Sequence, residues 1–330
     1  MIKIIDCKNK NYIKKLNFFL EKRKVVNRSS TDIAVKIVKD IKKNNLKALT
    51  KYEKKFSKNS NISLSKNKIL NLIKKLDPKV KDAIDFAYNR IYNFHKKQKI
   101  KNLRFVDKYN NLLQYKYTPI NSVGIYVPAN LPSTLLMNAI PAKIAGVKRI
   151  VLANPKFKGK VNLAVLYAAK KLNIGEVYTM GGAQAIASLA YIQKVNKIVG
   201  PGNDYVTRAK KEVFGDVGIE SMVAGPSEIT IVADKTANPD EIITSMIGQA
   251  EHDINSQSIL ITKNLDLINY LKKNLFTKLK EIPRKKIAKK SLLNNGLIIK
   301  VYNDNQIINI VNEIAPEHLE LNSKNYNKLL

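Results

Sequence analysis

The sequence has few of the residues that build disulfide scaffolds, cysteine-based metal clusters or export signals. Its 330 residues include one cysteine, Cys7, and no tryptophan. A single cysteine excludes a disulfide framework and a cysteine-based zinc cluster, and it fits a reducing compartment, so we predict a cytoplasmic location. The opening residues, MIKIIDCKNKN, contain no apolar h-region and predict no secretory signal. No apolar run approaches the roughly 18 residues of a membrane span.

Acidic residues and arginine are also scarce, and the formal net charge is +33. Such a charge would ordinarily indicate nucleic-acid binding. Only seven of the 59 basic residues are arginine, however, which is the residue that phosphate recognition favours for its bidentate geometry. The segment 116–260 holds 15 basic and 11 acidic residues and is nearly neutral. We therefore interpret the charge as a solvated lysine-rich surface, and nucleic-acid binding is the less favoured alternative.

The length predicts about two domains at roughly 150 residues each. Most of 8–100 has helical periodicity, with Ser30 as a plausible cap of the helix at 32–43. From residue 120 onward, short apolar strands alternate with helices, a pattern typical of parallel α/β sheets, which bind ligands at the carboxyl ends of their strands. We therefore predict an α/β fold with two Rossmann-like parallel-sheet domains and a helical N-terminal region. The predicted domains are a central one, 120–235, and a flanking one, 1–119 together with 236–330.

Three glycine-rich turns lie beside predicted strands. They are GGAQ at 181–184, GPGN at 200–203 and AGPSE at 224–228. The first two follow strands and open helices, so their backbone N–H groups could bind an anion, whereas the third leads into a strand. Plain connections are the alternative, and the sequence leaves both interpretations open. The common G-x-G-x-x-G and P-loop signatures are absent.

Histidine is scarce, with His95, His252 and His318 as the only three. His95 lies in a basic helical stretch and is interpreted as a surface residue. Gln249 and His252 end a helix that is predicted to start at the cap Asn238, and their spacing of three places them on one face. An amide oxygen and an imidazole could together serve a divalent metal such as zinc, but two ligands alone do not make a site.

A carboxylate directly precedes the third histidine, in the segment APEHL at 315–319. Proline fixes the local chain, and a turn can aim adjacent side chains into one cleft. Glu317 and His318 could then divide general-acid and general-base work. A Glu-His pair alone is weak evidence of a catalytic site.

Taken in order, these segments resemble one family, histidinol dehydrogenase. The resemblance covers most of 120–260 and about the last fifteen residues. It implies Rossmann-like domains in an aldehyde-dehydrogenase-like arrangement. The matching stretches are GIYVP (124–128), PSTLLMNAIPAKIAGVKRIVLANP (132–155), GGAQAIASLAY (181–191), KIVGPGNDYVTRAKKEVFG (197–215), AGPSEITIVAD (224–234), IGQAEHD (247–253) and APEHLEL (315–321).

The resemblance implies an enzyme of histidine biosynthesis that oxidises L-histidinol to L-histidine, through L-histidinal, in two NAD-dependent steps. It implies NAD and zinc as cofactors. It further implies contacts to NAD by Tyr126, Gln184 and Asn203, contacts to substrate by Ser227, Gln249, His252 and His318, zinc ligation by Gln249 and His252, and acid/base catalysis by Glu317 and His318.

The family pattern continues past APEHLE, where it supplies two further zinc ligands, another site histidine and much of the dimer contact. Relative to that pattern the sequence is interpreted as C-terminally truncated. We therefore expect either a homodimer or a complementing C-terminal polypeptide as partner. The alternatives are a folded but inactive remnant, one half of a split enzyme and, less favoured, a basic nucleic-acid-binding protein.

Overall fold

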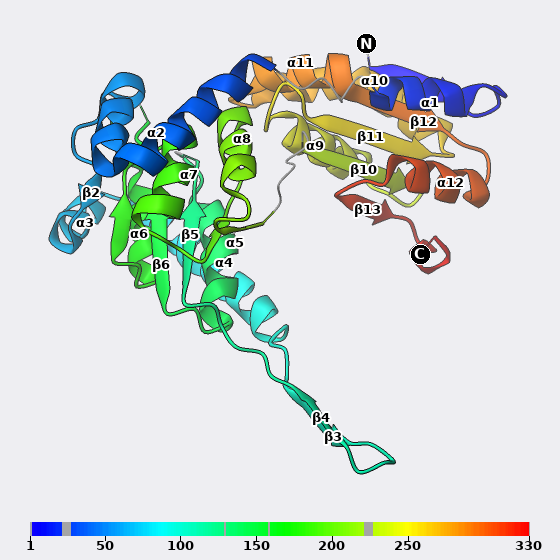
Figure 1. Cartoon of the computed structure of the whole chain (residues 1–330). Coiled ribbons are helices and arrows are strands. Elements are labelled where there is room, and N and C mark those ends of the chain that lie inside the picture. The colour runs from blue at the N-terminus through cyan, green and yellow to red at the C-terminus, as the bar shows by residue number, and fades with distance from the viewer. Residues whose placement is uncertain (1, 22–27, 129, 158, 221–226, 330) are drawn as a thin grey trace. The chain divides into compact units, whose positions relative to one another are not determined.

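Two compact units make up the chain. A computed structural model describes residues 2–21, 28–128, 130–157, 159–220 and 227–329 (Figure 1). One unit is Asn27–Ala224, and the other is Met1–Val26 together with Gly225–Leu330. Each unit contains one largely or wholly parallel sheet with helices on both faces. The predicted α/β class with two Rossmann-like parallel sheets is therefore confirmed.

The sheet of Asn27–Ala224 has the strand order β2-β7-β6-β5-β8-β9. Its neighbours run parallel except β2 and β7. From β7 to β9 this is the Rossmann order, in which the first and fourth strands of the series, here β5 and β8, meet where the connections reverse direction. The strands are β2 Ser63–Leu64, β5 Ser122–Tyr126, β6 Arg149–Ala153, β7 Glu176–Tyr178, β8 Lys197–Val199 and β9 Gly218–Ile219.

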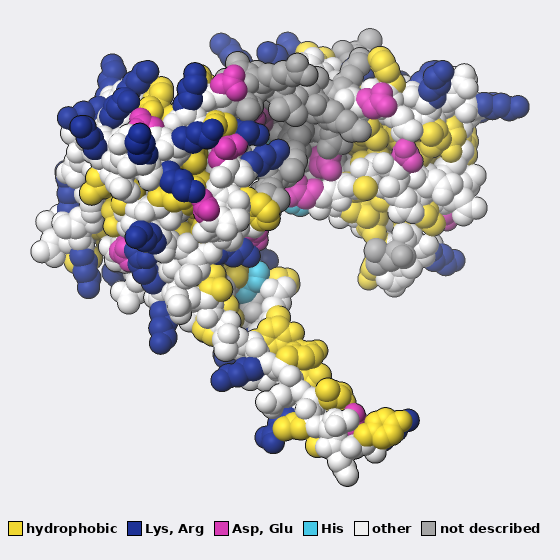
Figure 2. Space-filling view, in the orientation of Figure 1, with side chains coloured by type: hydrophobic (Ala, Val, Ile, Leu, Met, Phe, Trp, Pro, Cys, Tyr) yellow, Lys and Arg dark blue, Asp and Glu magenta, His cyan; other side chains and the backbone are white. Residues whose placement is uncertain are grey.

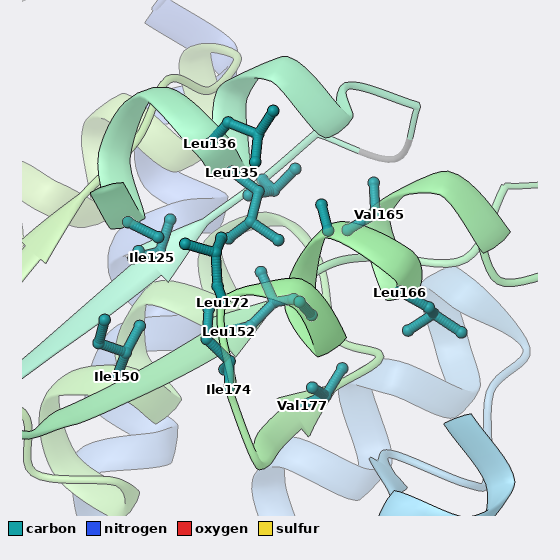
Figure 3. Packing of buried hydrophobic residues seen from close by; sticks show 14 of the residues in the cluster. Ile125, Leu135, Leu136, Ile150, Leu152, Val165, Leu166, Leu172, Ile174 and Val177 are labelled. Carbon is teal, nitrogen blue, oxygen red and sulfur yellow. The ribbon is translucent and has the colours of Figure 1, made fainter. Parts of the chain in front are cut away.

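Helices bury both faces of this sheet, as near-continuous apolar strands such as RIVLA at 149–153 require. Figure 3 shows the core on one face, where Ile125 and Leu152 of the sheet belong to one buried cluster with Leu135 and Leu166 of the helices. That face is covered by α3 Lys66–Ile73, α4 Pro78–Lys96, α5 Pro132–Ile144 and α6 Leu163–Lys171. The other face is covered by α2 Arg28–Tyr52, α7 Gly182–Ala187 with its π-helical continuation η3 Ser188–Ile192, and α8 Asp204–Val213.

Helices α2, α3 and α4 pack on this unit, whereas the sequence prediction grouped all of 1–119 with 236–330. Helix α2 packs on α7 and α8, and α4 packs on α5. The reason is that the apolar stripe of α2, with Ala34, Ile37 and Ile41 buried, packs against the apolar side chains of α7 and α8. Helix α2 also begins at Arg28, two residues before the predicted cap Ser30.

Strands β3 Leu103–Val106 and β4 Leu112–Tyr115 form an antiparallel hairpin that extends from this unit (Figure 1). A turn joins them, with Asn110 at a φ of 61°. Every residue of both strands is exposed, although most are apolar. The hairpin therefore gains little from burial, which is unusual for a two-stranded ribbon in water.

The sheet of the second unit has the order β1-β12-β11-β10-β13, and all its strands are parallel. The strands are β1 Lys3–Asp6, β10 Glu228–Ala233, β11 Gln257–Thr262, β12 Gly296–Lys300 and β13 Leu319–Asn322. One face is covered by α9 Pro239–Ala250, α10 Leu265–Lys278 and α11 Lys285–Asn295, and the other by α1 Tyr12–Glu21 and α12 Asp304–Ile314. Short 3-10 turns lie at η4 Leu279–Glu281 and η5 Tyr326–Lys328.

Asp234 ties the carboxyl end of β10 to the residues that follow β13. Burial raises its pKa, but hydrogen bonds from Thr236, Ser323 and Lys324 outweigh burial and lower the pKa to about 2. A carboxyl group whose pKa is lower in the folded than in the unfolded chain stabilises the fold at pH values above the unfolded-state pKa. This stabilisation is lost as the pH falls towards 2.

We therefore expect Asp234→Asn to lower the free energy of unfolding by about 1 kcal/mol at pH 7, discounted for the partial exposure of this side chain. The difference from the unchanged chain should shrink between about pH 4 and 2. Urea unfolding across that range measures it, with exposed Asp82→Asn as control. A deficit that persists unchanged at pH 2 would contradict the assignment.

Lysines and arginines lie scattered over the visible surface rather than in one patch (Figure 2). This distribution supports the interpretation of the charge as a solvated surface. In the part of the chain that the structure describes, no helix combines the length and apolarity needed to cross a bilayer.

Candidate active site

The residues predicted to bind NAD lie at the carboxyl edge of the first sheet. Tyr126 is the last residue of β5, and Gly200–Asn203 follow β8, its neighbour. These two strands meet where the connections reverse, which is the usual ligand position in a Rossmann-ordered sheet. Gln184 lies in the first turn of α7, which follows β7 at the same edge. The residues that the resemblance assigns to NAD therefore lie at the edge where the sequence analysis expects a ligand.

Tyr126 is packed against both glycine-rich turns. Its side chain is buried, and its hydroxyl accepts a hydrogen bond from the N–H of Gly182 at 3.4 Å. Burial raises the pKa of this phenol, the negative charge of Glu53 raises it further, and the Gly182 bond opposes them. At Gly200, φ is +105° and an added Cβ would lie 2.0 Å from the Tyr126 carbonyl oxygen. The two turns and the strand end thus form one tightly fitted surface.

The turn at 181–184 already holds an anion, and that anion belongs to the chain itself. Oε1 of Glu53 accepts hydrogen bonds from the Gly181 N–H and from Nε2 of Gln184, both at 3.0 Å. Glu53 opens η2 Glu53–Ser57 and is completely buried. The N–H of Gly181 is therefore engaged by an internal carboxylate, and sequence reasoning missed this residue because it lies more than a hundred positions away.

Asn203 caps helix α8. Its Oδ1 accepts from the N–H of Val206 at 3.2 Å, and the residue is exposed. Behind this turn, buried Lys210 donates from Nζ to the Gly200 carbonyl oxygen at 2.6 Å. Burial lowers the pKa of Lys210, and the charge of Glu220 opposes that shift. The ammonium group therefore fixes the turn from inside the unit.

The residues predicted to handle substrate lie in the other unit, at the amino edge of its sheet. Ser227 directly precedes β10, Glu317 and His318 directly precede β13, and β10 pairs with β13. In this unit the predicted substrate residues therefore lie on the segments that enter the strands, and not at the carboxyl ends where the sequence analysis expected ligands. The turn at 224–228 was also predicted as a candidate, and its residues 224–226 lie outside the described residues.

Glu228 holds the Glu-His pair in place. Its Oε1 accepts from the backbone N–H of Glu317 at 3.1 Å, and its carbonyl oxygen lies 3.1 Å from Nδ1 of His318. The His318 carbonyl accepts from the N–H of Thr230 at 2.9 Å, which joins β13 to β10. A carbonyl oxygen only accepts, so Nδ1 donates and Nε2 of a neutral ring keeps its lone pair. Both side chains of the pair are exposed.

Gln249 and His252 lie at the carboxyl end of α9. Asn238 caps this helix as predicted: its Oδ1 accepts from the N–H of Asp240 at 3.0 Å, and its Nδ2 donates to the Glu241 carboxylate at 3.3 Å. The predicted helix end at His252 is two residues late, because α9 stops at Ala250. Since α9 runs antiparallel to the strands it connects, its end reaches the same amino edge as the Glu-His pair.

A zinc ion accepts amide oxygen and imidazole nitrogen, so the chemistry of Gln249 and His252 suits it. Nε2 of Gln249 is buried and has no hydrogen-bond partner among the described residues. Within the described ranges, however, no group of three or more His, Cys, Asp or Glu could hold a metal ion. A zinc site needs three or four protein ligands, so these residues do not complete one. We therefore derive no reaction step through a metal.

Gln257 is a further polar residue at this edge that sequence reasoning missed. It opens β11, pairs in register with Glu228 and is buried, and both polar atoms of its amide lack a partner among the described residues. A buried amide without a partner is costly and indicates a ligand or water position. It lies two strands away from the Glu-His pair, with β10 between them, and the motif spacing did not reveal this position.

One sheet carries the predicted cofactor residues at its carboxyl edge, and the other carries an oriented Glu-His pair at its amino edge. This combination of Rossmann-like sheets is typical of a nucleotide-dependent dehydrogenase. Comparison with known proteins agrees. The family model described as histidinol dehydrogenase matches residues 20–330. The chain therefore belongs to the histidinol dehydrogenase family, and the predicted enzyme class, NAD-dependent dehydrogenase, is confirmed.

Several relatives share this similarity. The histidinol dehydrogenase of Pelagibacter ubique is 57% identical over 337 residues, which span 100% of this chain and 79% of that protein. That of Bacillus licheniformis is 43% identical, over 86% of this chain and 69% of the relative. The crystal structure of histidinol dehydrogenase from Elizabethkingia anophelis superimposes with a TM-score of 0.91 at 33% identity, covering 99% of this chain and 77% of the other.

Proposed function

We propose that this chain oxidises L-histidinol to L-histidine through L-histidinal, with one NAD reduced in each step. The observation that carries the proposal is the fixed orientation of the Glu317–His318 pair by Glu228. When bound, NAD accepts the hydride. The remaining chemistry, which is proton removal, water activation and orientation of the substrate, falls to side chains of the chain itself.

His318 is proposed as the base for the alcohol. With Nδ1 donating to the Glu228 carbonyl, Nε2 can take the hydroxyl proton as the hydride departs. Because this ring is exposed rather than buried, it is accessible to a substrate at the amino edge. The same nitrogen can return a proton to solvent between the two steps.

Glu317 is proposed to activate the water that hydrates the aldehyde. Its backbone is held by Glu228, while its exposed carboxylate can accept a proton from water. Hydration converts the aldehyde into a second alcohol-like carbon, from which a second hydride can leave. Two oxidations can thus use one pair of adjacent residues.

Ser227, Gln249 and His252 are proposed to orient the substrate, together with His318. The family implies a metal ion, and we propose that it is zinc and that Gln249 and His252 supply two of its ligands. Tyr126, Gln184 and Asn203 are proposed to contact NAD, because they gather at the carboxyl edge around the strand reversal.

Further zinc ligands would have to come from beyond the described residues. We therefore propose that the active form involves a second polypeptide, either another copy of the chain in a homodimer or a complementing C-terminal polypeptide. A cytoplasmic location also stays a prediction.

Formation of NADH from L-histidinol, followed by absorbance with purified chain and added zinc, tests the function. Turnover is expected, and it should vanish in a variant that combines Glu317→Gln with His318→Asn. A strong chelator should remove turnover, and zinc should restore it. A folded chain that stays inactive with zinc, and also with a C-terminal fragment of a relative, would favour the inactive-remnant alternative.

A further inference from the structure

Glu53 is a completely buried carboxylate for which the proposed reaction has no use. It opens the π-helical turn η2, a type of segment that often marks functional sites. Asn59 fastens the far end of this turn, because its backbone N–H donates to the Glu53 carbonyl oxygen at 3.1 Å and its Nδ2 donates to the Thr179 carbonyl at 2.5 Å. Thr179 directly follows β7, so Glu53 is held beside the carboxyl end of that strand.

The contacts of Glu53 determine how the Gln184 amide is oriented. An ionised carboxylate only accepts hydrogen bonds, and Oε1 of Glu53 meets Nε2 of Gln184 at 3.0 Å. The amide oxygen must then face the other way. The Gln184 amide oxygen lies over the turn at Gly182, because an added Cβ at Gly182 would be 3.1 Å from Oε1 of Gln184. Gly182 in turn donates to Tyr126, so this oxygen lies at the edge where the cofactor residues gather.

We propose that Glu53 is a positioning residue that turns the Gln184 amide so that it meets the cofactor as a hydrogen-bond acceptor. The inference rests on the proposed contact between Gln184 and NAD. The partner on the cofactor is then a donor, a ribose hydroxyl or the carboxamide NH2 group. If the amide were reversed, its NH2 group would face that donor, and the bond would be replaced by an unpaired contact.

Titration of NADH into the full-length chain, followed by fluorescence, tests this orientation. Glu53→Gln keeps the size of the side chain but allows its own NH2 group to donate to Gln184, which favours the reversed amide. We expect the Kd for NADH to rise about tenfold, the loss of roughly one net hydrogen bond. Gln184→Met should raise it by a similar factor.

The double variant separates positioning from simple support of the fold. If Glu53 acts through Gln184, then Glu53→Gln combined with Gln184→Met binds NADH no more weakly than Gln184→Met alone. Independent, multiplying losses would overturn the proposal while leaving the proposed function intact. Absence of NADH binding by the unchanged chain would overturn both.

The matched control is Glu176→Gln, at the amino end of the same strand, β7. Glu176 pairs there with Arg149 at 2.7 Å, and its loss should leave the Kd for NADH unchanged. Should Glu53→Gln fail to fold, Gln184→Glu tests the same contact from the other side, because two carboxylates would then face each other and must share a proton. NADH affinity of that variant should fall several-fold between about pH 5.5 and 8, and a flat profile would contradict the proposal.

Discussion

Replacing His318 by asparagine is expected to slow NADH formation from L-histidinol about a thousandfold, the usual scale for loss of a general base. Asparagine is smaller than histidine, but its NH2 group takes roughly the place of Nδ1 and can still donate to the Glu228 carbonyl, so the strand pairing at Thr230 should persist. What is lost is the nitrogen lone pair on the far side of the ring. Steady-state kinetics measures the effect, and kcat should fall far more than KM rises.

The control for this change is His95→Asn. His95 lies on α4, where Nδ1 contacts the Gln98 side chain at 2.6 Å, and it has no place in the proposed reaction. Its kcat should match that of the unchanged chain. If His318→Asn retained more than a tenth of the turnover, another group would have to serve as the base, and the assignment of His318 would fail.

Gly200→Ala should be the most destabilising single change at the cofactor edge. The new methyl group would lie 2.0 Å from the Tyr126 carbonyl oxygen, and the φ of +105° disfavours any side chain. Overpacking and backbone strain together predict a loss of about 3 kcal/mol or more in the free energy of unfolding, with weaker NADH binding. Chemical denaturation and NADH titration measure the two effects.

Gly215→Ala provides the matched comparison. Gly215 has a φ of +97°, but an added Cβ there meets nothing within 4 Å. Only the strain term remains, so we expect a loss of about 1 kcal/mol and unchanged NADH affinity. Equal losses at the two glycines would show that the close approach to Tyr126 does not matter.

The sequence predicted the central sheet well because its signals are local. The turns at 181–184 and 200–203 follow strands and open helices as predicted, and Asn238 caps its helix as predicted. Apolar runs, caps and glycine turns depend on a few neighbouring positions. The same holds for the Glu-His pair, whose two members are adjacent in the chain.

The assignment of α2, α3 and α4 to the flanking domain failed for the opposite reason, whereas β1 and α1 do belong to that domain. The stripe of Ile37 and Ile41 shows that α2 is amphipathic, but a stripe does not say which surface it will meet. Glu53 was missed for the same reason, since its contacts to Gly181 and Gln184 form only when the helix docks. In the second unit, the direction of α9 decides that Gln249 and His252 lie at the amino edge of the sheet. That direction follows from the sheet topology, which the local sequence pattern does not reveal.

Because α2 and η2 pack against α7, α8 and the turn at 181–184, they limit where the chain can be cut into fragments that fold. A fragment starting at residue 120 would leave the inner faces of α7 and α8, including Val206 and Ala209, without their cover. It would also lack the carboxylate that holds the start of α7. Such a fragment would expose a large apolar surface and is expected to precipitate, whereas a fragment cut as Asn27–Ala224 keeps both halves of the core of this unit.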